Sequence, residues 1–181
     1  MEVRMCALAL TAAAFVACAA PATSRSVVVM RDVGAEERAI GATIDDWHDA
    51  AAKADEGRYF AHFAERAVFL GTDATERWEA GGEGSAFRAY AHPHFAKGKA
   101  WTMRPTARHV TMGEGGGVAW FDEVLETKNL GPARGSGVVV RQAGTWKIAQ
   151  YNLSITVPNA RFAEVKDLLA APAVSPAPSA K

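Results

Sequence analysis

The last third of the chain reads as three consecutive strands joined by turns that are too short to hold a helix. These strands are expected at residues 118–126, 134–140 and 146–155, and Ala143-Gly144 is a two-residue hairpin turn between the last two. A longer strand is expected just before them, at residues 101–112. Large rings and charges at alternating positions of these strands predict a curved antiparallel sheet that forms the wall of a pocket.

The first half of the chain shows helical periodicity instead. The strongest helix is expected at residues 35–57, because apolar residues from Ile40 to Ala51 fall on one face and Gly57 can cap its end. Helices that precede the strands indicate an α+β fold, with three helices packed on a strongly curved, mostly antiparallel sheet. The remaining early elements are expected in this order: a helix at 58–65, a strand at 67–71, a polar loop at 72–84 and a helix at 85–97.

The N-terminus is typical of a bacterial export signal. Arg4 precedes an apolar run at residues 6–17, which is shorter than the about 20 residues that a membrane-spanning helix needs. Phe15-Val16-Ala17-Cys18 is similar to a lipobox, in which Cys18 would be lipidated, whereas Ala17-Cys18-Ala19 also fits ordinary secretion. A buried apolar helix of the fold is the other alternative. Residues 1–18 are therefore predicted to be a signal peptide, and the protein to be periplasmic or an outer-membrane lipoprotein.

Composition excludes several classes of function. Lys plus Arg and Asp plus Glu both number 20, so no basic surface for nucleic acid is expected. Both cysteines lie in the leader, which leaves no disulfide and no thiol nucleophile in the remainder. Two histidines in His92-Pro93-His94 do not supply the ligands that a metal site needs. No metal and no cofactor are expected, and the only membrane contact expected is the lipid anchor.

Three segments surround and follow the predicted domain. A linker is expected at residues 19–34, the domain itself at 35–160, and a terminal helix at 161–169. Residues 170–181 consist almost entirely of Ala, Pro and Ser, a composition that cannot pack a core, so a disordered tail is predicted there.

Six aromatic residues are expected to line the hollow between the sheet and the helices. Rings in a concave site favour an apolar or aromatic ligand. The six are Trp47, Phe60, Phe63, Trp78, Trp101 and Trp120.

A carboxylate on the same wall is the candidate for catalysis. The hairpin turn at Ala143-Gly144 pairs Ser136 with Tyr151. If the turn between Glu126 and Arg134 is symmetric, Asp122, Arg134 and Tyr151 share a face, while a slip of one residue brings in Glu123 instead. A carboxylate among rings loses hydration, and its raised pKa suits a general base. Arg134 or Tyr151 would stabilise the oxyanion. An ion pair or ordinary sheet packing is the alternative for each of these residues.

Four strings in this order resemble the SnoaL-like branch of the nuclear transport factor 2-like superfamily. They are residues 63–78, Ala119-Trp-Phe-Asp-Glu123, Arg134-Gly-Ser-Gly137 and Trp146-Lys-Ile-Ala-Gln-Tyr-Asn-Leu153. The resemblance covers residues 36–158 and implies a cone-shaped fold and a homodimer. It does not select an activity, because one fold hosts many functions.

Three functions remain open from the sequence. The first is a small-molecule-binding protein for an apolar or aromatic ligand, with no assigned reaction. The second is a cofactor-independent isomerase, cyclase or dehydratase, with Asp122 as the base. The third is an interaction module for another envelope protein, bound through the sheet.

Overall fold

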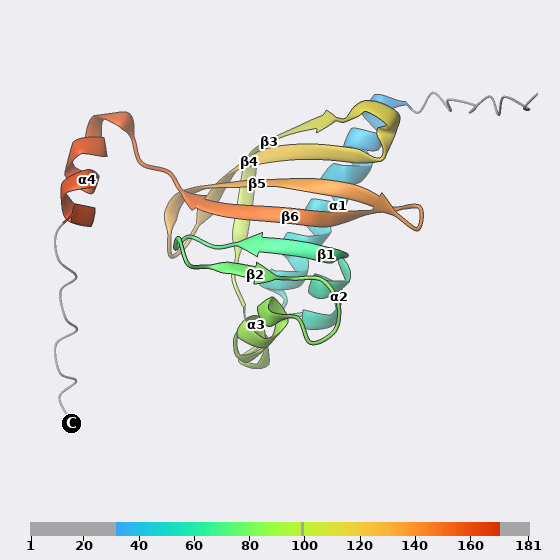
Figure 1. Cartoon of the computed structure of the whole chain (residues 1–181), viewed down its shortest axis with the longest axis horizontal. Helices are drawn as coiled ribbons and strands as arrows, with labels where there is room; N and C mark the ends of the chain where they lie inside the picture. The colour runs from blue at the N-terminus through green and yellow to red at the C-terminus, as the bar shows by residue number, and fades with distance from the viewer. Residues whose placement is uncertain (1–31, 99, 171–181) are drawn as a thin grey trace, which may run out of the picture.

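The computed structural model describes residues 32–98 and 100–170 (Figure 1). The expected signal peptide with Cys18, most of the linker and the tail after Ala170 lie outside the described residues, so export and lipidation stay predictions. Within the described ranges, no helix combines the length and the apolar character that crossing a membrane requires.

The described chain has the expected α+β architecture, built on one curved, unclosed sheet. The strand order is β2-β1-β6-β5-β4-β3, and every neighbouring pair is antiparallel except β1 with β6. In chain order the elements are α1 (Val33–Ala52), α2 (Glu56–Ala61), β1 (Phe63–Leu70), β2 (Arg77–Glu79), α3 (Ala86–Ala96), β3 (Met103–Met112), β4 (Val118–Thr127), β5 (Gly131–Gln142), β6 (Thr145–Ile155) and α4 (Phe162–Ala170).

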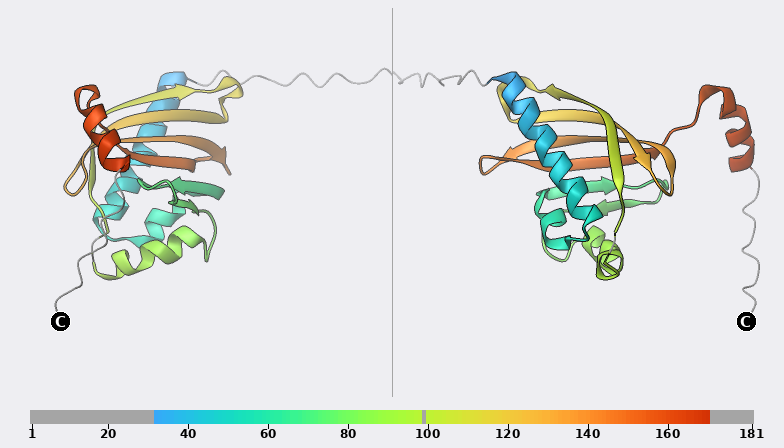
Figure 2. Two further views of the ribbon diagram at one scale, coloured as in Figure 1. Left: turned by 60° about the vertical axis from the view of Figure 1, so that its left-hand side comes forward. Right: turned by 180° about the vertical axis from the view of Figure 1, so that it is seen from behind.

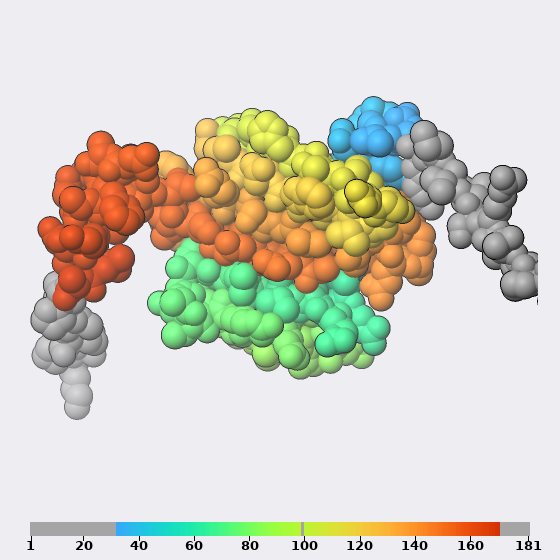
Figure 3. Space-filling model, turned by 45° about the horizontal axis from the view of Figure 1, so that its top comes forward, coloured from blue at the N-terminus to red at the C-terminus, as the bar shows by residue number. Residues whose placement is uncertain are grey.

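The helices α1, α2 and α3 lie on one side of the sheet. The right panel of Figure 2, seen from behind, shows α1 crossing in front of the strands, with α2 and α3 below it. The opposite face is formed by the strands themselves, and none of the described helices covers it in the space-filling view (Figure 3). Consequently β4 alternates regularly between exposed and buried residues over most of its length.

The helix α1 begins at a side-chain cap and ends before Gly57. The Asp32 carboxylate accepts from the Ala35 amide at 3.2 Å, and apolar residues such as Ile44 and Trp47 form the buried face. The chain turns at Ala54, whose φ is 55°, and the Asp55 carboxylate accepts from the Arg58 amide at 3.0 Å. This second cap starts α2, so the prediction that Gly57 ends the first helix is wrong.

The strand β1 overlaps the strand predicted at residues 67–71 but begins earlier, because residues 63–65, for which helical periodicity predicts a helix, belong to it. The Ile148 amide donates to the His62 carbonyl at 2.8 Å, and β1 then runs parallel to β6 from Phe63. This pairing joins residues more than eighty positions apart, which no local pattern shows. The strand β2 lies in the segment for which a polar loop is predicted. It has three residues, and Trp78 in it pairs with Phe69 of β1.

The hairpin between β5 and β6 has the predicted turn but a different register. Ala143 and Gly144 have φ of 50° and 83°, as a two-residue hairpin turn requires, and Val140 pairs with Lys147 as expected. Further along, Val139 pairs with Ile148 but Val138 pairs with Gln150, which leaves Ala149 as a β-bulge. Beyond the bulge every pairing is shifted by one residue, so the predicted pair of Ser136 with Tyr151 is wrong.

Aromatic rings fill part of the space between the sheet and the helices. Trp47, Phe60 and Phe63, all expected to line the pocket, are buried core residues. Trp47 stacks on Tyr59 with ring centroids 5.1 Å apart, and the edge of Phe63 lies against Trp47 at 5.7 Å. Aromatic packing therefore fills this space and stabilises the fold.

Candidate functional site

A pocket of about 700 Å³ lies between the sheet and α3. It lies between β1–β2, α3, the chain entering β3, and the turn that joins β4 to β5. Five rings from four segments of the chain form walls of this aromatic pocket: Phe69, Trp78, Phe87, Tyr90 and Trp101. Polar and charged residues complete the lining: Thr72, Glu76, His94, Lys97, Thr102, Thr127, Lys128 and Asn129.

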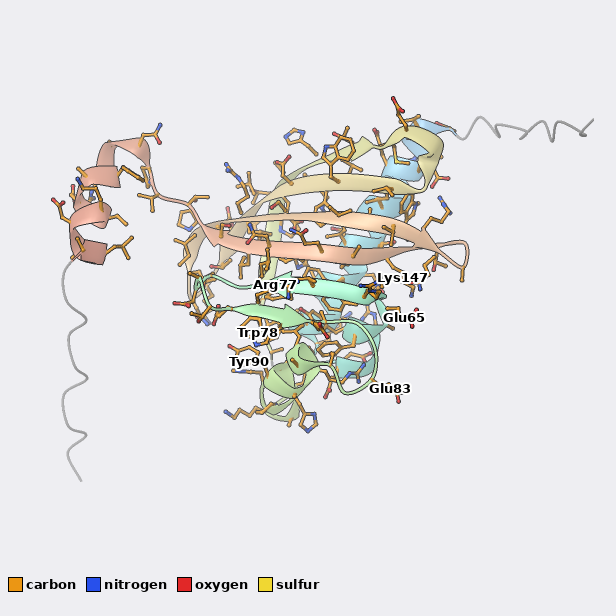
Figure 4. The ribbon with its side chains drawn as sticks, viewed as in Figure 1. Glu65, Arg77, Trp78, Glu83, Tyr90 and Lys147 are labelled. Carbon is orange, nitrogen blue, oxygen red and sulfur yellow. The ribbon has the colours of Figure 1, made fainter. Side chains whose placement is uncertain are left out.

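Ring stacking fixes the walls of the aromatic pocket. Trp78 of β2 and Tyr90 of α3 stack with centroids 4.7 Å apart, and Figure 4 shows them side by side. Phe69 of β1 stacks on Phe87 of α3 at 4.1 Å, and Trp101 lies 6.2 Å from Phe87. Because each ring is held by a neighbour from another element, the wall is rigid before any ligand arrives.

The aromatic pocket contains two of the six expected ring residues, Trp78 and Trp101. Trp120 is 51% exposed on the outer face of the sheet, where it cannot line the pocket. Sequence reasoning missed Phe69, Phe87 and Tyr90. The last two were detectable, because Phe87, Tyr90, His94 and Lys97 recur at helical spacing on one face of the predicted third helix.

A buried polar network lies deeper in the cone, centred on Glu123. This residue is 1% exposed, and its two carboxylate oxygens accept four hydrogen bonds. Oε1 accepts from His48 Nε2 at 2.7 Å and from the Tyr151 hydroxyl at 3.0 Å. Oε2 accepts from Nε and Nη2 of Arg108 at 2.9 and 2.8 Å. The carboxylate is thus held from α1, β3 and β6 at once, which ties the first helix to the sheet.

Arg108 extends this network to two groups of α1 nearer the surface. Its Nη1 donates to the Gly41 carbonyl at 3.1 Å and to the Asp45 carboxylate at 2.8 Å, both on α1. A guanidinium that uses its planar fork in this way binds more rigidly than a lysine would. Together His48, Asp45, Arg108, Glu123 and Tyr151 form the Glu123 network.

The surroundings keep Glu123 ionised and Tyr151 protonated. Burial raises the pKa of the Glu123 carboxyl, but the hydrogen bond and charge of His48, together with those of Arg108, outweigh burial and leave this pKa below its usual range. Burial raises the pKa of the Tyr151 hydroxyl, and the adjacent Glu123 charge raises it further. Tyr151 therefore remains a hydrogen-bond donor to a permanent anion.

The carboxylate expected to face the pocket points outward, and the neighbouring residue on β4 points inward instead. Asp122 and Arg134 are exposed on the outer face of the sheet, so the preference for Asp122 over Glu123 as the inward carboxylate is wrong. Asp122 pairs with Ser136 and shares a face with it as expected, but the bulge at Ala149 moves Tyr151 to the opposite face, where Glu123 lies. Tyr151 is inward, but Glu123, His48 and Tyr151 are not among the residues that line the aromatic pocket.

Acid is expected to weaken the fold through Glu123. Since its pKa is lower in the folded chain than the usual value of about 4.3, the folded state binds fewer protons than the unfolded state. The resulting stabilisation is fully present above that usual pKa and is lost as the pH falls through the lower, folded value. Urea unfolding at pH 7 and pH 3 should show a wild-type advantage over Glu123→Gln that shrinks at pH 3. A constant advantage would contradict the ionised state of Glu123.

No group of three or more histidine, cysteine, aspartate or glutamate residues that could hold a metal ion is found within residues 32–98 and 100–170. The arrangement therefore offers a ring-walled pocket and a separate, fully paired ionic network.

Comparison with known proteins gives one family and many structures of similar fold. A family model described as SnoaL-like domain matches residues 40–158. No curated protein matches this chain.

Three solved structures illustrate the similarity in fold. A cystatin-like domain of unknown function from Nostoc punctiforme superposes with a TM-score of 0.59 at 20% identity, over 78% of this chain and 90% of that one. A proposed aromatic ring hydroxylase from Novosphingobium aromaticivorans gives 0.58 at 22% identity, over 71% and 94%. A nuclear transport factor 2-like protein of unknown function from Pseudomonas putida gives 0.56 at 16% identity, over 71% and 91%. At these identities the likeness concerns the fold alone.

Proposed function

The chain belongs to the SnoaL-like domain family, and from that premise we propose that it binds a small apolar or aromatic molecule in the aromatic pocket. The observation that carries the proposal is a pocket of about 700 Å³ walled by five rings. Sites for small molecules typically measure about 300–1,000 Å³ and combine apolar walls with a few polar groups. The aromatic pocket has both properties.

The distribution of polar groups indicates how a ligand would be oriented. The rings come from β1, β2, α3 and the segment before β3, whereas Lys97 follows α3 and Lys128 lies in the turn after β4. Both lysines are exposed. A planar ligand would therefore place its ring against Trp78 and Trp101 and keep any polar substituent near the lysines, in contact with water.

The enzymatic alternative has less support from the geometry. A general base needs a free lone pair near the substrate and a pKa close to the working pH. Glu123 accepts four hydrogen bonds and its pKa is lowered. Asp122 faces away from the interior. The Glu123 network is accordingly proposed to stabilise the cone rather than to transfer protons.

The homodimer and the interaction module stay predictions. Trp120, Val118 and Val124 are exposed on the outer face of β4, where either kind of partner would pack. Substitutions of these residues serve as controls for substitutions in the pocket, because these residues lie on the opposite face of the sheet.

Two tryptophans provide a matched test of the proposed site. Fluorescence titration with anilinonaphthalene sulfonate, a planar aromatic anion, should show saturable binding to the wild-type protein. Trp78→Ala should raise the Kd about five- to tenfold, because losing a ring contact costs about 1–1.4 kcal/mol. Trp120→Ala should leave the Kd within about twofold, since that ring is outside the pocket. Equal effects of the two variants, or none, would contradict the proposal.

A further inference from the structure

The C-terminal helix α4 is amphipathic but buries none of its residues. Phe162, Val165 and Leu169 recur at the spacing that forms one helical stripe. Phe162 is 65% exposed and Leu169 81% exposed. Figures 1 and 3 show α4 standing away from the body of the molecule. A helix of nine residues is not stable alone in water, so its apolar stripe needs a surface to pack against.

The segment that carries α4 is attached beside the mouth of the aromatic pocket. Leu153, near the end of β6, lines the pocket, and Thr156 donates to the Pro132 carbonyl through its amide at 3.3 Å and its hydroxyl at 3.2 Å. These bonds hold the chain against β5 up to residue 156. Figure 1 shows α4 at the same end of the molecule as the turns after β1 and β4, which supply Thr72 and Lys128 to the pocket lining.

The dimensions allow α4 to reach the pocket without a second copy of the chain. Residues 157–161 include the 3₁₀ turn Asn159–Arg161, and they can span up to about 16 Å once that turn is extended. The helix itself is about 13 Å long, which is comparable with the width of a pocket for a drug-sized molecule. Tyr90 at the rim is itself 46% exposed, so an apolar surface is available at the mouth. A short tether anchored at the rim makes the chain's own pocket the nearest such surface.

We propose that α4 docks its apolar stripe on the mouth of the aromatic pocket of the same chain, where Phe162 and Leu169 complete the wall around a bound ligand. The inference rests on the proposed function for the identity of the site, but the docking of α4 is a separate event. Closure would remove the ligand and the exposed rings from water together, so ligand binding and docking strengthen each other.

Disulfide trapping tests the docking itself without a ligand. In a full-length chain carrying Cys6→Ser and Cys18→Ser, Leu169→Cys combined with Thr72→Cys should form a disulfide within one chain on mild oxidation. Asp167→Cys combined with Thr72→Cys is the matched control, because position 167 lies on the opposite side of the helix, and it should react at least about tenfold more slowly. A disulfide that joins two chains, or equal rates for the two pairs, would overturn the proposal.

Probe binding tests the contribution of α4 to the pocket. The double variant Phe162→Ser and Leu169→Ser should raise the Kd for anilinonaphthalene sulfonate about fivefold or more, because two apolar contacts with the ligand are lost. Ala163→Ser with Asp167→Asn, on the other side of α4, should leave the Kd within about twofold. An unchanged Kd in the first variant would overturn the role of α4 in the pocket. If Trp78→Ala also had no effect, the proposed function would fail, whereas the disulfide result would still decide whether α4 docks.

Discussion

Replacing Glu123 with alanine is expected to lower the free energy of unfolding by about 3–5 kcal/mol, because it leaves a buried ionic network without its anion. His48 and Tyr151 would lose the Glu123 acceptor in the interior, and Arg108 would keep only its bonds to α1. Removing one partner of a buried pair costs more than the pair contributes, since the remaining charge stays desolvated. Urea unfolding followed by circular dichroism measures the change.

The adjacent carboxylate provides the control for this experiment. Asp122 is one residue away on the same strand but is exposed on the outer face. Asp122→Ala should therefore change the free energy of unfolding by no more than about 0.5 kcal/mol. If Asp122→Ala were the more destabilising of the two, the assignment of Glu123 to the inner face of β4 would be wrong.

Adding a single methyl group at Gly135 is expected to be the second most damaging change. A Cβ at this position would lie 2.2 Å from the Tyr151 hydroxyl oxygen and 2.8 Å from Glu123 Oε1. Overpacking costs about 1–3 kcal/mol, and displacing the Tyr151 hydroxyl from Glu123 costs about 1–3 kcal/mol more. Gly135→Ala should thus lower the free energy of unfolding by at least about 2 kcal/mol, measured by the same urea titration.

Gly117 offers a glycine without that constraint. No atom lies within 4 Å of the Cβ that alanine would add there, and its φ of −103° is accessible to any residue. Gly117→Ala should be neutral or stabilise the fold by about 0.4–1 kcal/mol, because it restricts the unfolded chain. A comparable loss of stability at Gly117 and Gly135 would show that the network does not require the empty space at Gly135.

The fold was predictable from local patterns wherever those patterns were long. The apolar face of α1 and the alternation along β4 are strong periodic signals, and Ala143-Gly144 identified its hairpin turn correctly. By contrast, β1 depends on a parallel pairing with β6, and β2 has only three residues. Such elements form because of distant partners, so local propensity assigned the first residues of β1 to a helix and all of β2 to a loop.

The candidate site was predictable only in part. Residue spacing alone cannot show that Ala149 is left out of the ladder, yet this decides whether Tyr151 lies on the face of Asp122 or on the face of Glu123. The partners of Glu123 also come from α1 and β3, elements far from it in sequence, so His48 and Arg108 could not be assigned to it. Trp78 could be placed at a cavity mouth because a large ring in a polar segment tends to pack back on the protein.

The location of the Glu123 network also bears on how this protein can change over evolution. The residues that join α1 to the sheet are not part of the pocket lining, whereas Trp78, Tyr90, Lys97 and Lys128 are. The hydrogen bonds of the network do not involve any of these four residues. Residues of the pocket lining can therefore be substituted during evolution, and the ligand preference can change, while the chain keeps the stability that it needs to fold.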